Sequence, residues 1–451
     1  MSKNRLIVIG GDAAGMAAAS KVRREQPERE ILVFEKTGYT SYSACGLPYL
    51  IGGLIDHSDK LVVRSPETFR QKFAIDVRTE HEVTRIEPEK QRVEVYDING
   101  KRSIEESYDQ LLIATGARPR CPDVPNSDAA GIFGLSTLAS GIRVQEFLSS
   151  EKPQSAVVVG GGYIGLEMAE ALVRQNLDVS LVQRGSEVMG TLDRDMGAMV
   201  TQALRDIGVT VYLEESFTSF EAANGLVRAV NTERRTLPAD LVILGLGIEA
   251  NSELAETAGI DRSVKNAIKV DQQMRTSVEN IWAAGDCATS HHRVSGKPFY
   301  IALGTVANKQ GLVAGANLAG IESSFPGVVG TAVSKICSIE VGRTGLQEKE
   351  ATEHGFDYAT ARIEAKTRAG YYPGAGAITV KLLGEKGTGR LLGGQIVGME
   401  GAAKRIDILA TALTAGMTVD NLIDLDLSYA PPFSPVWDPV QTAARQLIKK
   451  L

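Results

Sequence analysis

The sequence predicts an α/β protein, because a short apolar strand, a glycine-rich turn and a helix follow one another at two places in the chain. At the first place a strand over residues 6–9 meets a turn over 10–15, and at the second a strand over 156–159 meets a turn over 160–165. From about Phe325 the pattern changes to longer strands and single helices, which is typical of an α+β module. We therefore expect two units of the nucleotide-binding type, followed by a smaller α+β unit.

The composition sets the broad class of the protein. A chain of 451 residues, of which 43% are hydrophobic and 23% charged, has material for two or three globular domains. The net charge of -6 and the lack of a dense Lys/Arg run argue against nucleic-acid binding, and no apolar stretch reaches the ~20 residues of a membrane span. The cysteines (Cys45, Cys121, Cys287 and Cys337) include no CxxC pair, so we expect no metal site, no disulfide framework and a cytoplasmic setting.

The first glycine-rich turn carries most of a dinucleotide-binding fingerprint. Asp12 stands in place of the middle glycine, but strand, turn and helix follow in the required order. A second apolar strand over residues 31–34 ends in Glu35, about 20 residues after the last glycine, where an acid binds the ribose diol of an adenosine. We therefore predict a dinucleotide site that includes Gly10, Gly11, Ala13, Ala14, Gly15 and Glu35.

Two later strands are expected to end at the same edge of this first sheet. The strand over residues 111–114 runs into a tight turn at Thr115 and Gly116, and the strand over 281–284 ends in Asp286. Open α/β sheets bind ligands at the carboxyl ends of their strands. Asp286 alone would be a turn former, but beside the first fingerprint its carboxylate can accept hydrogen bonds from a polyol. The ribityl chain of a flavin is such a polyol, so the pattern indicates FAD.

The second glycine-rich turn is a complete fingerprint, with glycines at 160, 162 and 165. Its second strand, over residues 179–182, ends in Gln183 and Arg184 rather than in an acid. Without a carboxylate to bind the 2′-hydroxyl or repel a 2′-phosphate, the unit favours NADPH. The alternative, in which Arg184 is only a solvated surface charge and NADH serves as well, stays open.

Cys45 lies in a turn with Gly46 and Pro48, soon after the first nucleotide motif. No second cysteine lies near it in the sequence, so an internal dithiol is excluded at this position. Any disulfide at Cys45 must be a mixed one with a small-molecule thiol, unless the sulfur carries an adduct such as a sulfenate or persulfide. The competing interpretation is a buried structural cysteine. We predict that Cys45 is redox-active.

Taken in order, these motifs resemble the FAD-dependent pyridine nucleotide–disulfide oxidoreductases, and more narrowly the single-cysteine branch typified by coenzyme A disulfide reductase. The most specific motifs are SxxxCGxPY around Cys45 and the segment Tyr429–Phe433. The resemblance implies two Rossmann-like dinucleotide-binding domains, for FAD and for NAD(P)H, and a C-terminal α+β dimerisation domain. The expected limits are 1–119 with 255–325 for FAD, 120–254 for NAD(P)H and 326–451 for dimerisation.

The resemblance also implies roles for individual residues. Cys45 would be the redox centre, with Tyr429 and Tyr371 supplied by the partner subunit of a homodimer as acid or orienting groups. Ser41 and Arg24 would contact the CoA part of the substrate. The implied cofactor contacts, beyond the first glycine turn, are Glu35, Lys36, Val83, Thr115, Gly116, Gly160, Gly162, Tyr163, Ile164, Gly165, Glu167, Arg184 and Asp286.

The chain departs from the family pattern at three places. Ala44 stands where some relatives have Asn, and Trp437 where some have a Lys that contacts CoA. Glu249 and Ala250 replace a common Arg-Pro. The first two departures weaken CoA disulfide as the substrate, because a lost Lys is a lost phosphate partner. They leave the expected thiol chemistry unchanged.

The sequence therefore predicts an enzyme that reduces CoA disulfide or a related small disulfide with NAD(P)H, through FAD and Cys45. One alternative is a persulfide, polysulfide or sulfur reductase using the same thiol. A second is an NADH oxidase or peroxidase with a Cys45 sulfenate, although relatives of that kind tend to carry His where this chain has Ala13. A third is a redox sensor in which turnover is incidental.

Overall fold

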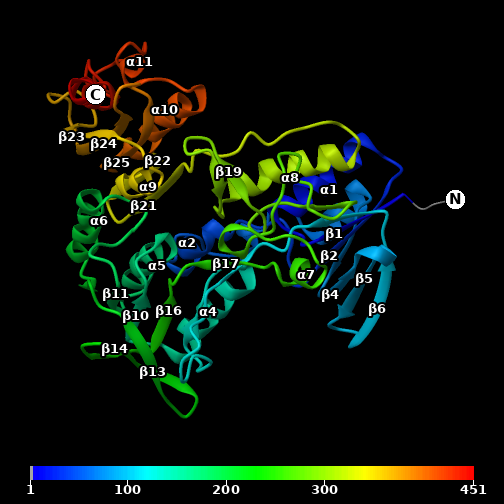
Figure 1. Cartoon of the computed structure of the whole chain (residues 1–451). Coiled ribbons are helices and arrows are strands. Elements are labelled where there is room, and N and C mark those ends of the chain that lie inside the picture. The colour runs from blue at the N-terminus through cyan, green and yellow to red at the C-terminus, as the bar shows by residue number, and fades with distance from the viewer. Residues whose placement is uncertain (1–3) are drawn as a thin grey trace.

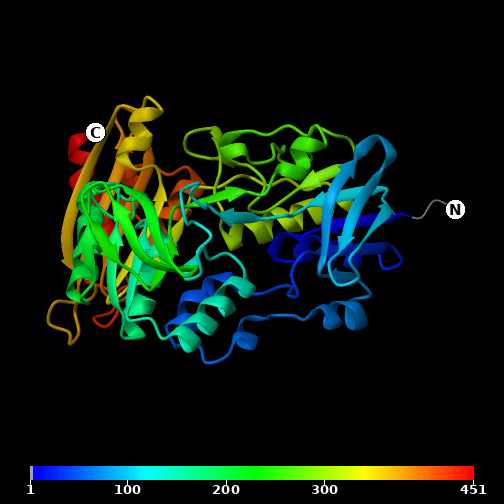
Figure 2. The same cartoon turned by 90° about the horizontal axis from the view of Figure 1, so that it is seen from below.

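The computed structural model describes residues 4–451 as three units, each built on a five-stranded sheet (Figure 1). In Figure 1 the first unit lies on the right, the second at the lower left and the third at the upper left. Figure 2 shows the first and third units at opposite ends of an elongated molecule. The predicted α/β fold with a C-terminal α+β unit is confirmed, whereas the exact domain limits stay a prediction.

The first unit contains a parallel sheet of order β18-β7-β1-β2-β3. Strands buried on both faces read as continuous apolar runs, and in β1 Leu6 and Val8 face the helices while Ile7 and Ile9 face a second, antiparallel sheet. The parallel strands are β1 (Arg5–Ile9), β2 (Glu30–Glu35), β3 (Asp76–Thr79), β7 (Gln110–Ile113) and β18 (Ile281–Ala283). The antiparallel sheet contains β4 (His81–Glu87), β5 (Arg92–Asp97) and β6 (Arg102–Ser107).

Two helices, α1 (Ala13–Glu25) and α8 (Gly304–Leu318), cover the other face of this sheet and pack closely against each other. A Cβ at Gly311 would lie 2.4 Å from the carbonyl oxygen of Ala14. The two helix backbones can approach this far only because α8 carries glycine at the contact.

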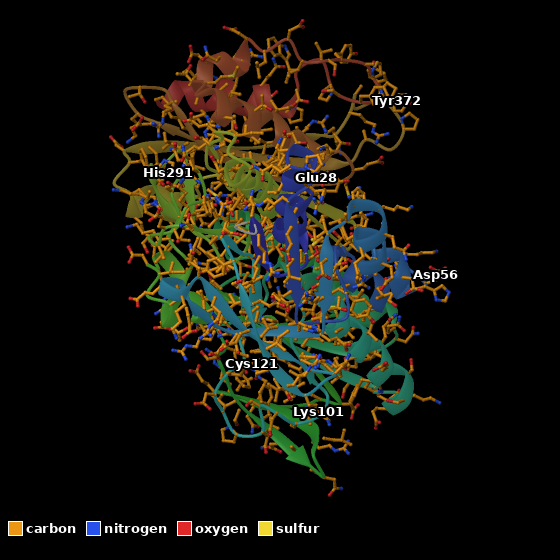
Figure 3. The ribbon with its side chains drawn as sticks, turned by 90° about the vertical axis from the view of Figure 1, so that its right-hand side faces the viewer. Glu28, Asp56, Lys101, Cys121, His291 and Tyr372 are labelled. Atoms are coloured by element: carbon orange, nitrogen blue, oxygen red, sulfur yellow. The ribbon has the colours of Figure 1, made fainter. Side chains whose placement is uncertain are left out.

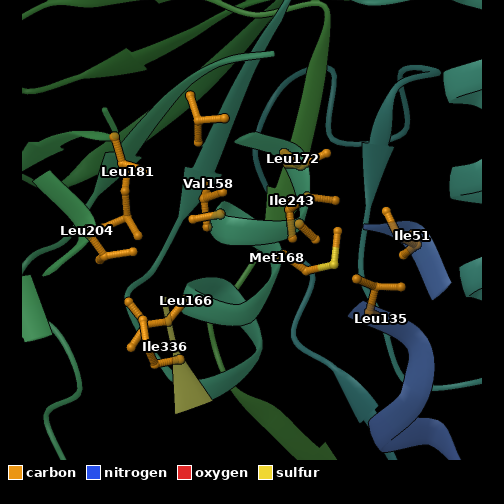
Figure 4. Close-up of a cluster of buried hydrophobic side chains, with 14 of the residues drawn as sticks. Ile51, Leu135, Val158, Leu166, Met168, Leu172, Leu181, Leu204, Ile243 and Ile336 are labelled. Carbon is orange, nitrogen blue, oxygen red and sulfur yellow. The ribbon is translucent and has the colours of Figure 1, made fainter. Parts of the chain in front are cut away.

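The second unit repeats this architecture with a parallel sheet of order β12-β11-β10-β16-β9. Figure 4 shows its core on the side of α5, where Val158 and Ile243 of the sheet pack with Leu166 and Leu172 of the helix. The strands are β9 (Ile132–Phe133), β10 (Ser155–Val159), β11 (Asp178–Val182), β12 (Thr210–Tyr212) and β16 (Leu241–Leu244). The helices are α4 (Leu138–Glu151), α5 (Tyr163–Arg174) and α6 (Arg194–Asp206), and the second sheet contains β13 (Phe217–Ala223), β14 (Leu226–Thr232) and β15 (Thr236–Pro238).

The third unit is an antiparallel sheet of order β21-β22-β25-β24-β23 with α10 and α12 packed against it. Its strands are β21 (Ala332–Ile336), β22 (Ile339–Gly345), β23 (Tyr358–Lys366), β24 (Ala377–Glu385) and β25 (Leu391–Gly398). Its helices are α9 (Glu348–Glu353), α10 (Ala402–Ala415), α11 (Val419–Ile423) and α12 (Pro439–Leu447).

Shorter elements lie between and around these sheets and helices. They are α2 (Leu47–Ile51), α3 (Pro66–Phe73), α7 (Glu253–Thr257), β8 (Ala117–Pro119), β17 (Ile248–Ala250), β19 (Ser290–His292) and β20 (Lys297–Phe299), with 3₁₀ turns at Ala44–Gly46, Ser58–Leu61, Pro88–Lys90, Val264–Asn266 and Ile448–Lys450. Within residues 4–451, no helix is long and apolar enough to cross a membrane. No group of His, Cys, Asp or Glu side chains in the same part of the chain could hold a metal ion.

A buried ion cluster joins the second and third units. Lys381 of β24 is only 5% exposed, and its Nζ lies 3.1 Å from Asp193, 2.7 Å from Asp195 and 3.2 Å from Glu348. Burial alone would lower the pKa of Lys381, but the adjoining carboxylates of Asp195 and Asp193 outweigh burial and raise it. Asp193, just before α6, also accepts a hydrogen bond from the side chain of Gln395 at 2.8 Å. The cluster therefore fixes the start of α6 against the third sheet.

We predict that Lys381→Met destabilises the protein by about 3–5 kcal/mol, because it leaves the buried carboxylate of Asp193 without its cation. Lys386→Met is the matched control, since Lys386 pairs with Asp357 at 2.8 Å on the surface and its loss should cost under about 1 kcal/mol. Denaturant unfolding of both variants measures the difference. Equal effects would show that the buried cluster does not hold the two units together.

Candidate functional site

The first glycine turn brings the start of α1 against the sheet. A Cβ at Gly10, where φ is +108°, would lie 2.1 Å from the carbonyl oxygen of Ala114. A Cβ at Gly15 would lie 2.0 Å from the carbonyl oxygen of Gly10. Ala13 and Ala14 follow in the first turn of α1. The turn therefore presents bare backbone at a helix N-terminus, which is an arrangement suited to a pyrophosphate.

Glu35 and Gln183 occupy equivalent positions in the two nucleotide-type units. Glu35 Oε2 accepts the N–H of Gly11 at 2.7 Å, and Gln183 Oε1 accepts the N–H of Gly161 at 3.0 Å. Each side chain thus accepts a hydrogen bond from the glycine turn of its own unit, but only Glu35 is a carboxylate. Arg184, next to Gln183, is exposed and makes no ion pair within residues 4–451. The second unit therefore has an exposed guanidinium, and no carboxylate, directly after its second strand.

The second glycine turn leaves room at its middle position. A Cβ at Gly160, with φ at +102°, would lie 2.3 Å from the carbonyl oxygen of Gly245, and a Cβ at Gly165 would lie 2.1 Å from that of Gly160. A Cβ at Gly162 would have only one neighbouring atom, 4.0 Å away. The outer glycines are thus required for packing, whereas Gly162 faces open space where a pyrophosphate can approach the start of α5.

Asp286, at the carboxyl end of β18, presents a carboxylate without a hydrogen-bond partner within residues 4–451. Burial raises the pKa of Asp286 to about 6, and burial raises the pKa of nearby Asp12 to about 7. The Tyr300 hydroxyl donates to the backbone carbonyl of Asp286 at 2.9 Å, so the carboxylate oxygens themselves remain available. A partly buried carboxylate in this position fits a polyol donor, and together with the first glycine turn it fits a flavin dinucleotide.

The turn at Thr115 and Gly116 lies beside this carboxylate, because Thr115 contacts the Cys287 thiol that follows Asp286. A Cβ at Gly116 would meet no atom within 4 Å, so this turn faces open space. Asn251, which the sequence analysis missed, holds the turn through a hydrogen bond from its Nδ2 to the Thr115 carbonyl at 2.8 Å.

Cys45 lies in the 3₁₀ turn that precedes α2 and is exposed. Partial burial, followed by the carboxylates of Glu167 and Asp286, raises the pKa of its thiol. The segment that carries Cys45 contacts both units. The Tyr42 N–H donates to Asp12 of the first unit, and the carbonyls of Ile51 and Gly52 accept hydrogen bonds from Gln175 and Arg174 of the second. The structure therefore brings together the predicted thiol and a predicted contact residue from each nucleotide-type unit.

Residues at the start of α5 line the second unit's side of this region. Glu167 accepts a hydrogen bond from the Ser334 hydroxyl at 2.7 Å, which links α5 to the third unit, and burial raises the pKa of Glu167. Thr191 donates to the Tyr163 hydroxyl at 3.4 Å, and burial raises the pKa of Tyr163. Ile164 is half-buried beside it.

Tyr371 and Tyr429 are on the third unit and lie next to each other, and a hydrogen bond between their hydroxyls raises the pKa of Tyr371. The exposed fractions of these two residues are 77% and 46%. Figure 3 shows Tyr372, the neighbour of Tyr371, on a loop at the outer edge of the C-terminal unit.

The remaining predicted residues lie around the first unit. Lys36 pairs with Glu82 at 2.7 Å, and Val83 is buried in the core between the two sheets. Ser41, with φ at +47°, donates its N–H to the Gly11 carbonyl at 3.1 Å. Arg24 is exposed in the last turn of α1.

Comparisons with known proteins agree with this geometry. Residues 4–311 match the family described as pyridine nucleotide-disulphide oxidoreductase, and residues 331–439 match the dimerisation domain of that family. The chain is 40% identical to the NAD(P)H coenzyme A polysulfide/persulfide reductase of Pyrococcus horikoshii, over 99% of this chain and 98% of that protein. It is 32% identical to the coenzyme A disulfide reductase of Staphylococcus epidermidis, over 96% and 97% of the two chains.

A solved structure, that of the NAD-dependent persulfide reductase from A. fulgidus, superposes with a TM-score of 0.96 at 42% identity. The match covers 99% of this chain and 83% of that one. The resemblance inferred from the motifs is confirmed. The chain belongs to the pyridine nucleotide-disulphide oxidoreductases, a family of oxidoreductases that depend on FAD and use NAD(P)H.

Proposed function

We propose that this enzyme uses NAD(P)H to reduce a sulfur–sulfur bond held on Cys45, with CoA disulfide or a related small disulfide as the substrate. One observation carries the proposal: the exposed thiol lies on a segment that is hydrogen-bonded to Asp12 of the first unit and to Arg174 and Gln175 of the second. Cys287 is buried, and burial raises the pKa of the Cys337 thiol to about 12. Cys121 is exposed but lies outside the segment that contacts both units, so Cys45 is the thiol suited to exchange with a substrate disulfide.

Glu35 and Asp286 would hold the adenosine and ribityl parts of FAD, and the second glycine turn would hold the pyrophosphate of NAD(P)H. Bound FAD would supply transfer of an electron pair from NAD(P)H to sulfur. The Cys45 thiolate attacks the substrate disulfide, forms a mixed disulfide and releases one thiol. Two electrons and one further proton then release the second thiol and restore the Cys45 thiolate.

A basic surface near Ser41 supports a phosphate-bearing substrate. The Ser41 carbonyl accepts the N–H of Val63 at 2.8 Å, which brings the following Arg64 beside the Cys45 segment. The guanidinium carbon of Arg64 lies 5.2 Å from the ring centre of Phe73, the last residue of α3. Arg24 lies in the last turn of α1, where its neighbour Arg23 donates to the carbonyl of Ala74, directly after α3. Neither Arg24 nor Arg64 makes an ion pair within residues 4–451, so both can bind the phosphates of CoA.

A persulfide or polysulfide is the second candidate substrate. It is favoured by Trp437 and Ala44, which remove two polar groups from the expected CoA site, and by the 40% identity to a polysulfide/persulfide reductase. Anaerobic NADPH oxidation started with CoA disulfide separates the candidates. Rapid turnover supports CoA disulfide. If NADPH reduces the flavin but CoA disulfide is not turned over, a persulfide or polysulfide becomes the favoured substrate.

A homodimer is part of the proposal, and the protein matches a dimerisation domain. The third unit exposes large apolar side chains that a second copy of the chain would cover. They are Tyr371, Met399, Tyr429, Phe433, Val436 and Trp437. Tyr429 of one subunit would then protonate the sulfur leaving at the other subunit's Cys45. The four free thiols are compatible with a cytoplasmic setting.

We predict that Cys45→Ser lowers disulfide reduction by at least about 100-fold, because serine cannot form the mixed disulfide. FAD content should be unchanged, since Cys45 does not belong to the dinucleotide cradle. Cys121→Ser, at another exposed cysteine, is the matched control and should keep full activity. Retained activity in Cys45→Ser would contradict the assignment.

For the coenzyme, Arg184→Ala should raise the KM for NADPH by about tenfold through loss of a charged phosphate contact. The KM for NADH should not change. Steady-state kinetics with both coenzymes make this comparison. If Arg184→Ala changes the KM values for NADPH and NADH equally, or changes neither, Arg184 is only a solvated surface charge.

Mixed dimers test the shared site. One subunit carries Cys45→Ser and the other carries Tyr371→Phe with Tyr429→Phe, each with its own affinity tag. If Cys45 works with the partner's tyrosines, one site in each mixed dimer is intact, and activity should be about half that of the wild type. Both parent homodimers should be weak. A mixed dimer as weak as its parents would place all three residues in one subunit's site.

A further inference from the structure

The chain crosses between the first and second units through two short strands that pair with each other. In this antiparallel ribbon, β8 follows β7 of the first sheet and β17 follows β16 of the second. Arg118 of β8 lies opposite Glu249 of β17, and their side chains form an ion pair at 2.7 Å. Arg118 also contacts Glu253 at 2.5 Å and donates to Asn251 Oδ1 at 3.0 Å.

This pairing explains one departure of the sequence from its family. An arginine at position 249 would face Arg118 directly across the ribbon, and like charges opposite each other in a sheet are destabilising. Glu249 places a negative charge opposite Arg118, so the two side chains attract each other. Because each of these side chains is roughly half exposed, the pair orients the ribbon more than it stabilises the protein.

Asn251, directly after β17, is bound to the Thr115–Gly116 turn at three points. Its N–H donates to the Gly116 carbonyl at 3.0 Å, and its Nδ2 donates to the Thr115 carbonyl at 2.8 Å. Its own carbonyl accepts from the Thr115 hydroxyl at 2.6 Å. The residue that ends the crossover from the second unit therefore determines the backbone of a turn in the first.

We infer that Asn251 is a positioning residue, which sets the Thr115–Gly116 turn against the flavin according to the orientation of the NAD(P)H unit. The ion pair of Arg118 and Glu249, called the clamp below, holds the ribbon that leads to Asn251. The inference rests on the proposed place of the flavin at that turn. It does not depend on which sulfur compound is the substrate, because it concerns only the transfer from NAD(P)H to FAD.

The test is the anaerobic rate of flavin reduction when FAD-loaded enzyme is mixed with NADPH and no disulfide. Asn251→Ala should lower the limiting rate by about tenfold, because it removes the side-chain hydrogen bond to the Thr115 carbonyl and the one from Arg118, and leaves only the two backbone bonds to the turn. The NADPH concentration for half-maximal rate should stay the same, because the second glycine turn is untouched. The visible absorption of the bound flavin should shift, since the polar backbone beside it moves.

Asn231→Ala is the matched control. Asn231 is also half-buried and uses its side chain in hydrogen bonds, to Ser219 and Thr236, but it lies in the antiparallel sheet of the second unit. It should change neither the rate nor the spectrum. A wild-type rate and spectrum in Asn251→Ala, or equal losses in both variants, would overturn the inference.

The clamp provides a second variant on the surface, in case Asn251→Ala does not fold. Glu249→Arg should slow flavin reduction by about threefold, by placing two arginines opposite each other. Adding Arg118→Glu should restore most of the rate. An unchanged rate in Glu249→Arg, or no recovery in the double variant, would overturn the role of the clamp. Failure of CoA disulfide turnover alone bears on the proposed function and leaves this result unaffected.

Discussion

The close backbone contact at the first glycine turn is the constraint on which the rest of the structure depends. A Cβ at Gly10 would overlap the carbonyl that ends the neighbouring strand, 2.1 Å away. The same turn holds the Cys45 segment, because its backbone carbonyl accepts the N–H of Ser41 and the Asp12 carboxylate accepts the N–H of Tyr42, each at 3.1 Å. The dinucleotide cradle and the thiol are therefore built on one piece of backbone.

The third unit completes this arrangement from the other side. Ser334 donates to Glu167 at 2.7 Å, and the Cys337 N–H donates to Glu170 at 2.7 Å, so the hairpin of β21 and β22 holds α5 by two carboxylates. The Lys381 cluster holds the start of α6 in the same way. The second unit is thus fixed between the ribbon at one end and the third sheet at the other. This fixes where its coenzyme site faces relative to the thiol.

Local patterns in the sequence were sufficient to predict the two glycine turns, the exposed Cys45 and the carboxylate of Asp286, because strand, turn and helix signals lie within a few residues of one another. They could not predict the two three-stranded antiparallel sheets, whose strands are only partly buried. Asn251 and Lys381 were also missed, since their partners are distant in the sequence and no spacing rule connects them. Tyr429 was predicted from resemblance alone, and its role at the partner's thiol stays a prediction.

The most direct measurement of the central claim is a mass spectrum of Cys45 after reaction. The reduced enzyme is mixed with an excess of CoA disulfide without NAD(P)H, quenched in acid and digested. The account predicts one CoA on the peptide that contains Cys45, released by a reducing agent, with the peptides of Cys121, Cys287 and Cys337 unmodified. A CoA adduct on another cysteine, or none on Cys45 in enzyme that still turns over the disulfide, would contradict it.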